Sequence, residues 1–335
     1  MTRRERIEAT LAGQRADRPP VSFWRHWPGD DQTAETHAGV TLAYQLEFDW
    51  DFIKVTTSGT AFHLEDLGVK TQVANTQGGN REITFNPLKG PADWVGLKTL
   101  DVSQGAHGQH LRCLHLIGNE VGTEIPFLFS VFSPSTLAER LIGSNELALH
   151  ARCNPLPLRR LLDVLTETMV AFVRGGMRTG AAGIFYATST TTYRTWSEAE
   201  YKEFGREHDL AVLREAVTCG SWFNILHLHG ADPMFDLTMD FPVQAINWDD
   251  RVTPPTIAQA RAKFSGVLLG GINQNGTLLR GAPADVEAEA HDAFAQAGGK
   301  GFILSAGCST AATVPKRNLH AARRVVEKLN CQEAS

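Results

Sequence analysis

The chain has 335 residues, of which 42% are hydrophobic and 21% are charged, and its formal net charge is −5. This length fits one large barrel or two ordinary domains, and a mildly acidic chain without a basic stripe is not expected to bind nucleic acid. The start is charged and no run of 18 apolar residues occurs, so neither a signal peptide nor a membrane span is expected. The five cysteines are odd in number and scattered, which predicts no disulfide framework and a cytoplasmic protein.

Short apolar runs alternate with longer helical patterns along the chain. Eight runs predict parallel strands buried on both faces, at 20–23, 52–55, 125–129, 183–186, 223–228, 243–248, 267–270 and 302–304. Helical patterns between them include 158–179, 198–219, 283–297 and 318–329, and Ser197 with Glu200 forms a capping-box sequence. Repeated strand–helix units predict an α/β fold with a parallel sheet. Eight strands favour a single (β/α)₈ TIM barrel, and a doubly wound open sheet is the main alternative.

The segment between the second and third predicted strands, about 56–124, is unusually long. It contains two hairpin-like pieces, 69–73 and 82–85, with Gly78 and Gly79 between them. We interpret it as an insertion over the mouth of the barrel and not as a second domain. Residues 1–330 are therefore expected to form one barrel domain, and 331–335 a frayed C-terminal tail.

The clearest candidate site combines two histidines and a cysteine. In such barrels the functional side chains lie just after the strands. His227 and His229 are two residues apart on the fifth strand and so point to the same side, and Cys308 follows the eighth strand at the same mouth. Two imidazoles and one thiolate suit Zn²⁺, with a fourth position open for substrate or water. An equally weighted alternative is a hydrogen-bonded core histidine and a small buried cysteine.

Other polar residues follow further strands. Arg25 and His26 end the first strand, where an arginine in a pocket would clamp a carboxylate, although a surface arginine remains an alternative. Asp51, beside the second strand, could take up a proton or could be plain surface acidity. Asn247 and Asp249 lie at the end of the sixth strand and are expected to line the mouth, although Asp249 could instead cap the next helix. The sequence has no dinucleotide or P-loop motif, so a nucleotide-binding fold is not supported.

Four motifs in the last third have a familiar order and spacing. They are Leu226-His-Leu-His-Gly, Asn247-Trp-Asp, Leu269-Gly-Gly-Ile-Asn and Phe302-Ile-Leu-Ser-Ala-Gly-Cys. With them, the chain resembles the uroporphyrinogen decarboxylase and cobalamin-dependent methyltransferase superfamily over most of its length. This resemblance implies a (β/α)₈ barrel and, as in the decarboxylases, a homodimer.

The resemblance separates into two branches. In the decarboxylase branch, Arg25 matches the first of two arginines that hold porphyrinogen carboxylates, the second is absent, and Asp51 is the nearest candidate for the catalytic aspartate. Gly307 and Cys308 stand where that branch has a histidine, so the octa-acid substrate is not expected. In the methyltransferase branch, zinc is held by His-x-Cys and a later cysteine. His227 and Cys308 match two of these ligands, and His229 stands in place of the middle cysteine.

Three functional hypotheses follow. The preferred one is a zinc-dependent methyltransferase, in which a methylated corrinoid on a partner protein, or a small methylated compound, supplies a methyl group to a thiol or similar acceptor. Arg25 would anchor a substrate carboxylate beside His26, and Asn247 and Asp249 would orient groups at the mouth. The second is a metal-free decarboxylase of porphyrin biosynthesis that uses Arg25 and Asp51. The third is a non-catalytic corrinoid- or tetrapyrrole-binding barrel with a vestigial triad.

Overall fold

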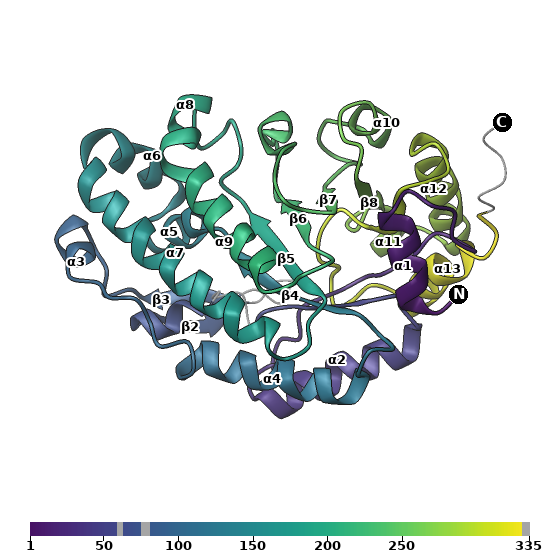
Figure 1. The fold of residues 1–335 in the computed structure, drawn as a ribbon, viewed down its shortest axis with the longest axis horizontal. Coiled ribbons are helices and arrows are strands. Elements are labelled where there is room, and N and C mark those ends of the chain that lie inside the picture. Colours follow the sequence, from purple (N-terminus) through teal and green to yellow (C-terminus); the bar gives the residue numbers. More distant parts are fainter. Residues whose placement is uncertain (59–62, 75–80, 330–335) are drawn as a thin grey trace.

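The computed structural model describes residues 1–58, 63–74 and 81–329. Within these residues, seven parallel strands form one curled sheet, in the order β1-β4-β5-β6-β7-β8-β9, and helices lie around its outer side (Figure 1). The sheet strands are β1 Ile53–Val55, β4 Phe127–Phe132, β5 Gly183–Thr188, β6 Ile225–Leu228, β7 Ala245–Trp248, β8 Val267–Ile272 and β9 Phe302–Ala306. A separate antiparallel hairpin pairs β2 Lys70–Val73 with β3 Arg81–Phe85.

Helices of very different length connect and cover these strands. The α-helices are α1 Arg3–Leu11, α2 Ala34–Phe48, α3 Pro91–Val95, α4 Gly105–Val121, α5 Pro134–Ile142, α6 Ser144–Cys153, α7 Pro155–Met177, α8 Glu198–Tyr201, α9 Glu207–Thr218, α10 Ile257–Arg261, α11 Thr277–Arg280, α12 Pro283–Gln296 and α13 Lys316–Val325. Two 3₁₀ turns, η1 Leu64–Leu67 and η3 Phe235–Thr238, and one π turn, η2 Lys202–Arg206, complete the set. No helix in the described ranges is both long enough and apolar enough to cross a bilayer.

The first predicted strand, 20–23, is the one that the structure does not form as a strand. Two prolines, Pro19 and Pro20, remove N–H donors at its start, and Val21 makes only an isolated parallel bridge to Leu304 of β9. The segment still lies between the two edges of the sheet. Leu304 donates its backbone N–H to Pro20 O at 2.9 Å, and the N–H of Asp51, ahead of β1, donates to Val21 O at 2.9 Å.

The long stretch after β1 has structure of its own. The two predicted hairpin pieces form β2 and β3, while Gly78 and Gly79 lie outside the described residues. α4 then leads directly into β4, as a crossover helix does between parallel strands. Further along the chain, the capping box of Ser197 and Glu200 is confirmed at the start of α8. The helix predicted over 198–219 is divided into α8 and α9 by the π turn η2.

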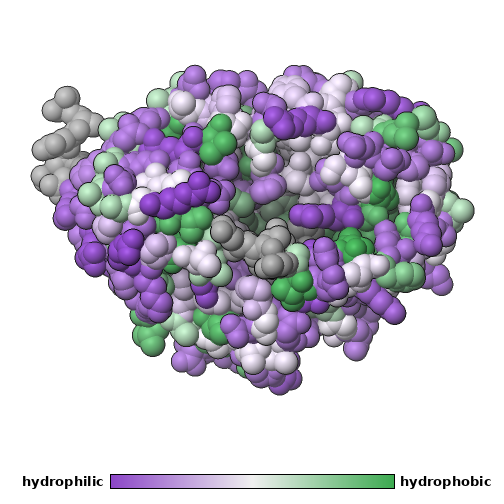
Figure 2. All heavy atoms as spheres, turned by 180° about the vertical axis from the view of Figure 1, so that it is seen from behind, coloured by the Kyte–Doolittle hydropathy of each residue, from purple (hydrophilic) through white to green (hydrophobic). Residues whose placement is uncertain are grey.

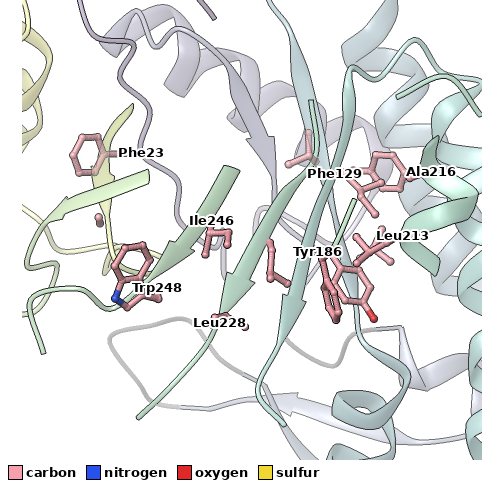
Figure 3. Close-up of a cluster of buried hydrophobic side chains, with 14 of the residues drawn as sticks. Phe23, Phe129, Tyr186, Leu213, Ala216, Leu228, Ile246 and Trp248 are labelled. Carbon is pink, nitrogen blue, oxygen red and sulfur yellow. The ribbon is translucent and has the colours of Figure 1, made fainter. Parts of the chain in front are cut away.

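Alternate residues of the strands pack on opposite faces of the sheet. Outward-facing side chains such as Tyr186 of β5 pack against Leu213 and Ala216 of α9, and neighbouring strands add Phe129 and Ile246 to the same layer (Figure 3). The other face lines the inside of the curl with a second apolar cluster. Its strand residues include Phe52, Leu128, Phe185, Ile225, Ala245, Leu269 and Ile303. This inner cluster fills much of the curl and extends to the cavity described below.

The same alternation places polar residues further along the inner face. His227 is two residues after Ile225, Asn247 two after Ala245, and Lys54 two after Phe52, so all three continue the inward-facing rows. The register pairs His227 with Ala187 on one side and Asn247 on the other. The curled sheet therefore has an apolar interior that becomes polar at the carboxyl ends of its strands.

Candidate metal centre

The two histidines and the cysteine meet at the carboxyl ends of β6 and β9. His227 lies on β6, and His229 follows it, held by a 2.8 Å hydrogen bond from its backbone N–H to Thr188 O. Cys308 follows the end of β9 by two residues. His227 is buried, Cys308 is half-buried and His229 is exposed. One edge of the group is therefore open to an incoming molecule.

The spacing of the three donor atoms matches that of ligands around one metal ion. Cys308 Sγ lies 3.7 Å from Nε2 of His227 and 3.5 Å from Nδ1 of His229. In a tetrahedral zinc site with ordinary bond lengths, a sulfur and a nitrogen ligand are about 3.6 Å apart. All three donor atoms lie within 4.8 Å of one another, and this is the one such group of His, Cys, Asp or Glu in the described residues. The residues present thus fit a tetrahedral ion with one remaining position.

The charge state of Cys308 also suits a metal ligand. Burial by itself would raise the pKa of this thiol, but hydrogen bonds from His227 and His229, together with their charges, outweigh it and hold the pKa well below its ordinary value. The hydrogen bond to Cys308 and the charge of its thiolate in turn raise the pKa of His229. Cys308 is therefore held as a thiolate, the form that binds metal ions.

Asn247 fixes the proton position of His227. Its amide nitrogen donates to two backbone carbonyls, Leu269 O at 2.8 Å and Ala306 O at 3.1 Å, which defines the orientation of the amide. The amide oxygen then accepts a 2.6 Å hydrogen bond from Nδ1 of His227. The ring therefore carries a proton on Nδ1, and Nε2, which faces Cys308, is the nitrogen that would lose its proton and offer a lone pair to a metal ion. Partners of this kind orient metal-binding histidines in proteins generally.

We expect Asn247→Ala to lower zinc affinity by about 10- to 100-fold, the usual cost of losing such a partner. The reason is that His227 loses the acceptor that holds its proton on Nδ1. Competition with a chromophoric chelator measures the affinity. Asn119→Ala is the matched control, because Asn119 is exposed on α4. Equal affinities of the Asn247 and Asn119 variants would contradict this role.

Asp249 lies beside the same group without belonging to it. It accepts a 3.0 Å hydrogen bond from Gln274, and its other carboxylate oxygen is buried without a partner. Burial raises its pKa, and the neighbouring charge of Cys308 adds to the increase. A Cβ on Gly307 would lie 2.7 Å from the Cα of Asp249, so glycine allows the chain leading to Cys308 to pass close by. The side chain does not cap the following helix, in contrast to the alternative considered from the sequence.

A cavity of about 220 Å³ opens beside the three donors. His227, His229 and Cys308 form one side of it. Other lining residues include Lys54 of β1, Ser189 just after β5 and Arg140 of α5. Two of the lining residues are cationic, and none carries a carboxylate. The cavity therefore suits a small molecule with a negative charge.

Lys54 is the functional candidate that sequence reasoning missed. Its ammonium is buried 4.7 Å from the ring centre of Phe185 and 5.8 Å from that of Trp24. Burial lowers its pKa to about 7, against the opposing field of the Cys308 thiolate. The signal was present in the sequence, because a lysine interrupts the otherwise apolar run Phe52-Ile-Lys-Val. A buried cation on a strand facing a cavity is expected to bind something there.

Of the predicted pair Arg25 and His26, only His26 lines this cavity. Burial, with smaller contributions from the charges of Lys54 and His37, lowers the pKa of His26 to about 3, so the ring is neutral. Arg25 turns the other way. Its guanidinium stacks 4.1 Å from the ring centre of Trp27, donates to Ala312 O at 2.8 Å, and lines a separate cavity of about 330 Å³. The structure does not bring Arg25 to the metal donors, because the irregular segment 20–25 lacks the alternation of a strand.

Asp51 also lies away from the three donors. It precedes β1 by two residues and so sits at the amino end of the sheet. Its carboxylate accepts hydrogen bonds from Arg6 and Arg18, both at 2.7 Å, and from the backbone N–H of Val21 at 2.8 Å. Every contact of this buried group serves to join α1 and the segment after it to β1.

Comparison with known proteins places this geometry in context. A family model described as uroporphyrinogen decarboxylase (URO-D) matches residues 2–329. Over 334 residues the chain is 24% identical to a methylcobamide:CoM methyltransferase, MtbA, of Methanosarcina mazei, and the match covers 95% of each chain. Over 237 residues it is 27% identical to a uroporphyrinogen decarboxylase of Cellvibrio japonicus, covering 66% of this chain and 64% of the other.

A solved structure has the same architecture. It is described as a methyltransferase from Methanosarcina mazei, and it superposes with a TM-score of 0.84 at 19% identity, covering 98% of this chain and 99% of the other. At this level of identity the similarity shows a shared fold. Chemistry within a shared fold depends on the residues of the site.

Proposed function

The chain belongs to the uroporphyrinogen decarboxylase family, and on that basis we propose that it is a zinc-dependent methyltransferase acting on a small anionic thiol. One observation carries the proposal: His227, His229 and Cys308 converge at ligand spacing on the wall of a cationic cavity. Several relatives are named methylcobamide:CoM methyltransferases. A methylated corrinoid on a partner protein is therefore the donor that we propose here.

The chain's own residues would divide the work as follows. His227, His229 and Cys308 would hold the ion, and Asn247 would keep His227 in the tautomer that leaves Nε2 free. A bound zinc would supply a fourth position for the acceptor sulfur and lower the pKa of its thiol. Cys308 is the one anionic ligand of the three. The ion would therefore keep a net positive charge that favours an incoming thiolate.

Lys54 takes the role that the sequence had suggested for Arg25. Its ammonium lines the same cavity as the three donors, whereas Arg25 does not. We propose that Lys54 binds the carboxylate or similar anionic group of the acceptor while the sulfur lies at the metal. Arg140 adds a second positive charge to the same wall. The small cavity limits the acceptor to a few heavy atoms between these two ends.

For the fold, we infer that 20–25 takes the place of an eighth strand. Hydrogen bonds to β9 on one side and to Asp51 on the other support this position. The predicted domain, 1–330, would then be one TIM barrel with 56–124 as its insertion, whereas the predicted tail, 331–335, lies outside the described residues. The homodimer implied by the family resemblance stays a prediction, which light scattering of the purified protein would test.

A methyl-transfer assay tests the proposed function. The zinc-loaded protein is incubated with methylcobalamin and a panel of thiols, and loss of the methylcobalamin absorbance is followed. We expect faster transfer to mercaptoacetate, mercaptopropionate or CoM than to mercaptoethanol, and no enhancement in a metal-free sample. Transfer to none of these thiols would count against the proposal. Tight cobalamin binding without turnover would instead favour the non-catalytic barrel.

The decarboxylase hypothesis predicts a different outcome with uroporphyrinogen. We expect little or no conversion to coproporphyrinogen, for two structural reasons. The macrocycle is much larger than the cavity of about 220 Å³, and Asp51 is engaged by two arginines far from that cavity's lining. Chromatography of the oxidised porphyrins measures the product. Efficient conversion by the purified protein would make the decarboxylase the better description.

A further inference from the structure

Four buried histidines from different segments meet beside α4, outside the candidate metal centre. They are His37 on α2, His63 just before η1, and His107 and His110 on α4, and none is more than 3% exposed. The ring centre of His63 lies 4.6 Å from that of His107 and 5.0 Å from that of His110. His110 lies 5.7 Å from His37. We refer to these four residues as the histidine cluster.

Most ring nitrogens of the histidine cluster lack a hydrogen-bond partner among the described residues. Five buried nitrogens are unpartnered there: Nε2 of His37, His63 and His107, and both nitrogens of His110. Phe172 of α7 contacts three of the rings, with ring centres 5.2 to 5.8 Å apart. The rings are packed as apolar groups. Burying a charged imidazole in such surroundings without a partner is costly.

The histidine cluster joins η1 to the helices. His63 has a left-handed backbone, with φ of 64°, and it begins the 3₁₀ turn that leads into β2. Asp66 on the same turn accepts hydrogen bonds from the backbone N–H groups of Ala106 and His107 and from Nδ1 of His107 at 2.6 Å. One segment is thus attached to α4 at two places, through Asp66 and through the imidazole rings.

We propose that the histidine cluster is an acid-sensitive latch, which holds η1 and the adjoining hairpin against α4 and α7 only while its rings are neutral. The groups that face it offer little compensation for added positive charge. Asp66 is an anion that contacts it, and this carboxylate already pairs with His107. Lys54 of β1 and His26 act on His110 and His37 as further positive or potentially positive neighbours. Protonation would therefore add charges that repel one another in the core.

The direction of the pH effect follows from the two states of the latch. In the closed state, burial lowers the pKa of His37 to about 4 and holds those of His63 and His110 well below the ordinary value of 6.5. In an open state these rings would regain ordinary values, so below pH 6.5 the open state binds more protons. The closed state is fully favoured above pH 6.5 and loses stability as the pH falls. Each histidine that is protonated only on opening raises the opening constant about tenfold per pH unit.

Hydrogen exchange of the full-length protein tests this latch. Peptides from η1, β2 and the first turns of α4 are compared at pH 7.5 and 5.5, after correction for intrinsic exchange rates, with α12 as the internal reference. Between pH 7.5 and 5.5, we expect the protection of the peptides from η1, β2 and α4 to fall by about tenfold or more, because at least one ring is protonated on opening. The protection of α12 should change little. Unchanged protection in the first group, or equal loss in α12, would overturn the proposal.

Variants separate the latch from general acid sensitivity. His110→Phe keeps an aromatic ring beside Phe172 but cannot be protonated, and His63→Asn keeps a residue that tolerates a left-handed backbone. In each variant, the opening constant should rise with acid by about one tenfold factor per pH unit less than in the wild-type protein. Circular dichroism at pH 7.5 establishes that each variant is folded. His115→Gln is the matched control, because His115 is exposed on the same helix. A wild-type acid response in both His110→Phe and His63→Asn would show that the histidine cluster is not the latch.

Discussion

Cys308→Ala is expected to abolish stoichiometric zinc binding under conditions in which the wild-type protein holds one ion per chain. Cys308 is the anionic member of the donor group, and its sulfur lies within 3.7 Å of both histidine nitrogens. Loss of an outer partner alone costs about 10- to 100-fold in affinity, so loss of this ligand should cost more. Elemental analysis after expression in zinc-supplemented medium, followed by chelator competition, measures the change.

Two further variants make this result specific. Cys308→Ser should restore little binding, because a neutral hydroxyl is a poor zinc ligand at neutral pH, whereas Cys308→Asp should restore part of it through a carboxylate. Cys153→Ser is the matched control, since Cys153 is an exposed free thiol on α6. A wild-type protein without bound zinc, or a Cys308→Ala variant that retains it, would end the zinc proposal. Methyl transfer should fall in parallel with metal content across the series.

Lys54→Met is expected to raise KM for an anionic thiol by about 10- to 100-fold, the equivalent of one lost charge-assisted hydrogen bond. KM for an uncharged thiol such as mercaptoethanol should change little, and zinc content should not change, because Lys54 is not a ligand. Burial lowers the pKa of Lys54 to about 7. The preference of the wild-type protein for anionic over neutral thiols should therefore weaken as the pH rises above 7.

Lys54→Met is expected to weaken substrate binding but to increase the stability of the folded protein. Met replaces a buried ammonium between Phe185 and Trp24 with an apolar side chain of similar length. Because the pKa of Lys54 is lowered in the folded protein, its burial costs stability below the ordinary value of 10.5, and this cost is largest below pH 7. Thermal unfolding at pH 7 should show a higher Tm for Lys54→Met, and the difference should shrink towards pH 10. Arg25→Met is the control variant for KM, and equal effects at both positions would contradict the assignment to Lys54.

On the face shown in Figure 2, exposed hydrophobic residues are scattered among hydrophilic ones and are not gathered in one broad patch. Single exposed apolar residues are normal on folded proteins and identify no partner. A docking site for a corrinoid protein is therefore better sought by binding experiments than by surface hydropathy.

Local patterns were sufficient for much of the fold and for the convergence of the three candidate metal ligands. Largely apolar runs identified the strands from β1 to β9 of the main sheet, because a strand buried on both faces carries apolar residues at most positions. The i, i+2 spacing of His227 and His229 also determined that both face one side. Cys308 was found because the carboxyl ends of parallel strands open at the same end of a barrel. These inferences depend only on strand periodicity and on a shared direction.

Only the tertiary structure decided which other residues join the site. The sequence suggested Arg25 and not Lys54, but Arg25 lies on an irregular segment whose side-chain directions follow no period. Lys54 lies two residues after an inward-facing phenylalanine on a regular strand, so it points into the cavity. The histidine cluster was beyond sequence reasoning for a related reason. Its members are separated by up to 73 positions in the chain, from His37 to His110, and only the packing of α2, η1 and α4 brings their rings into contact.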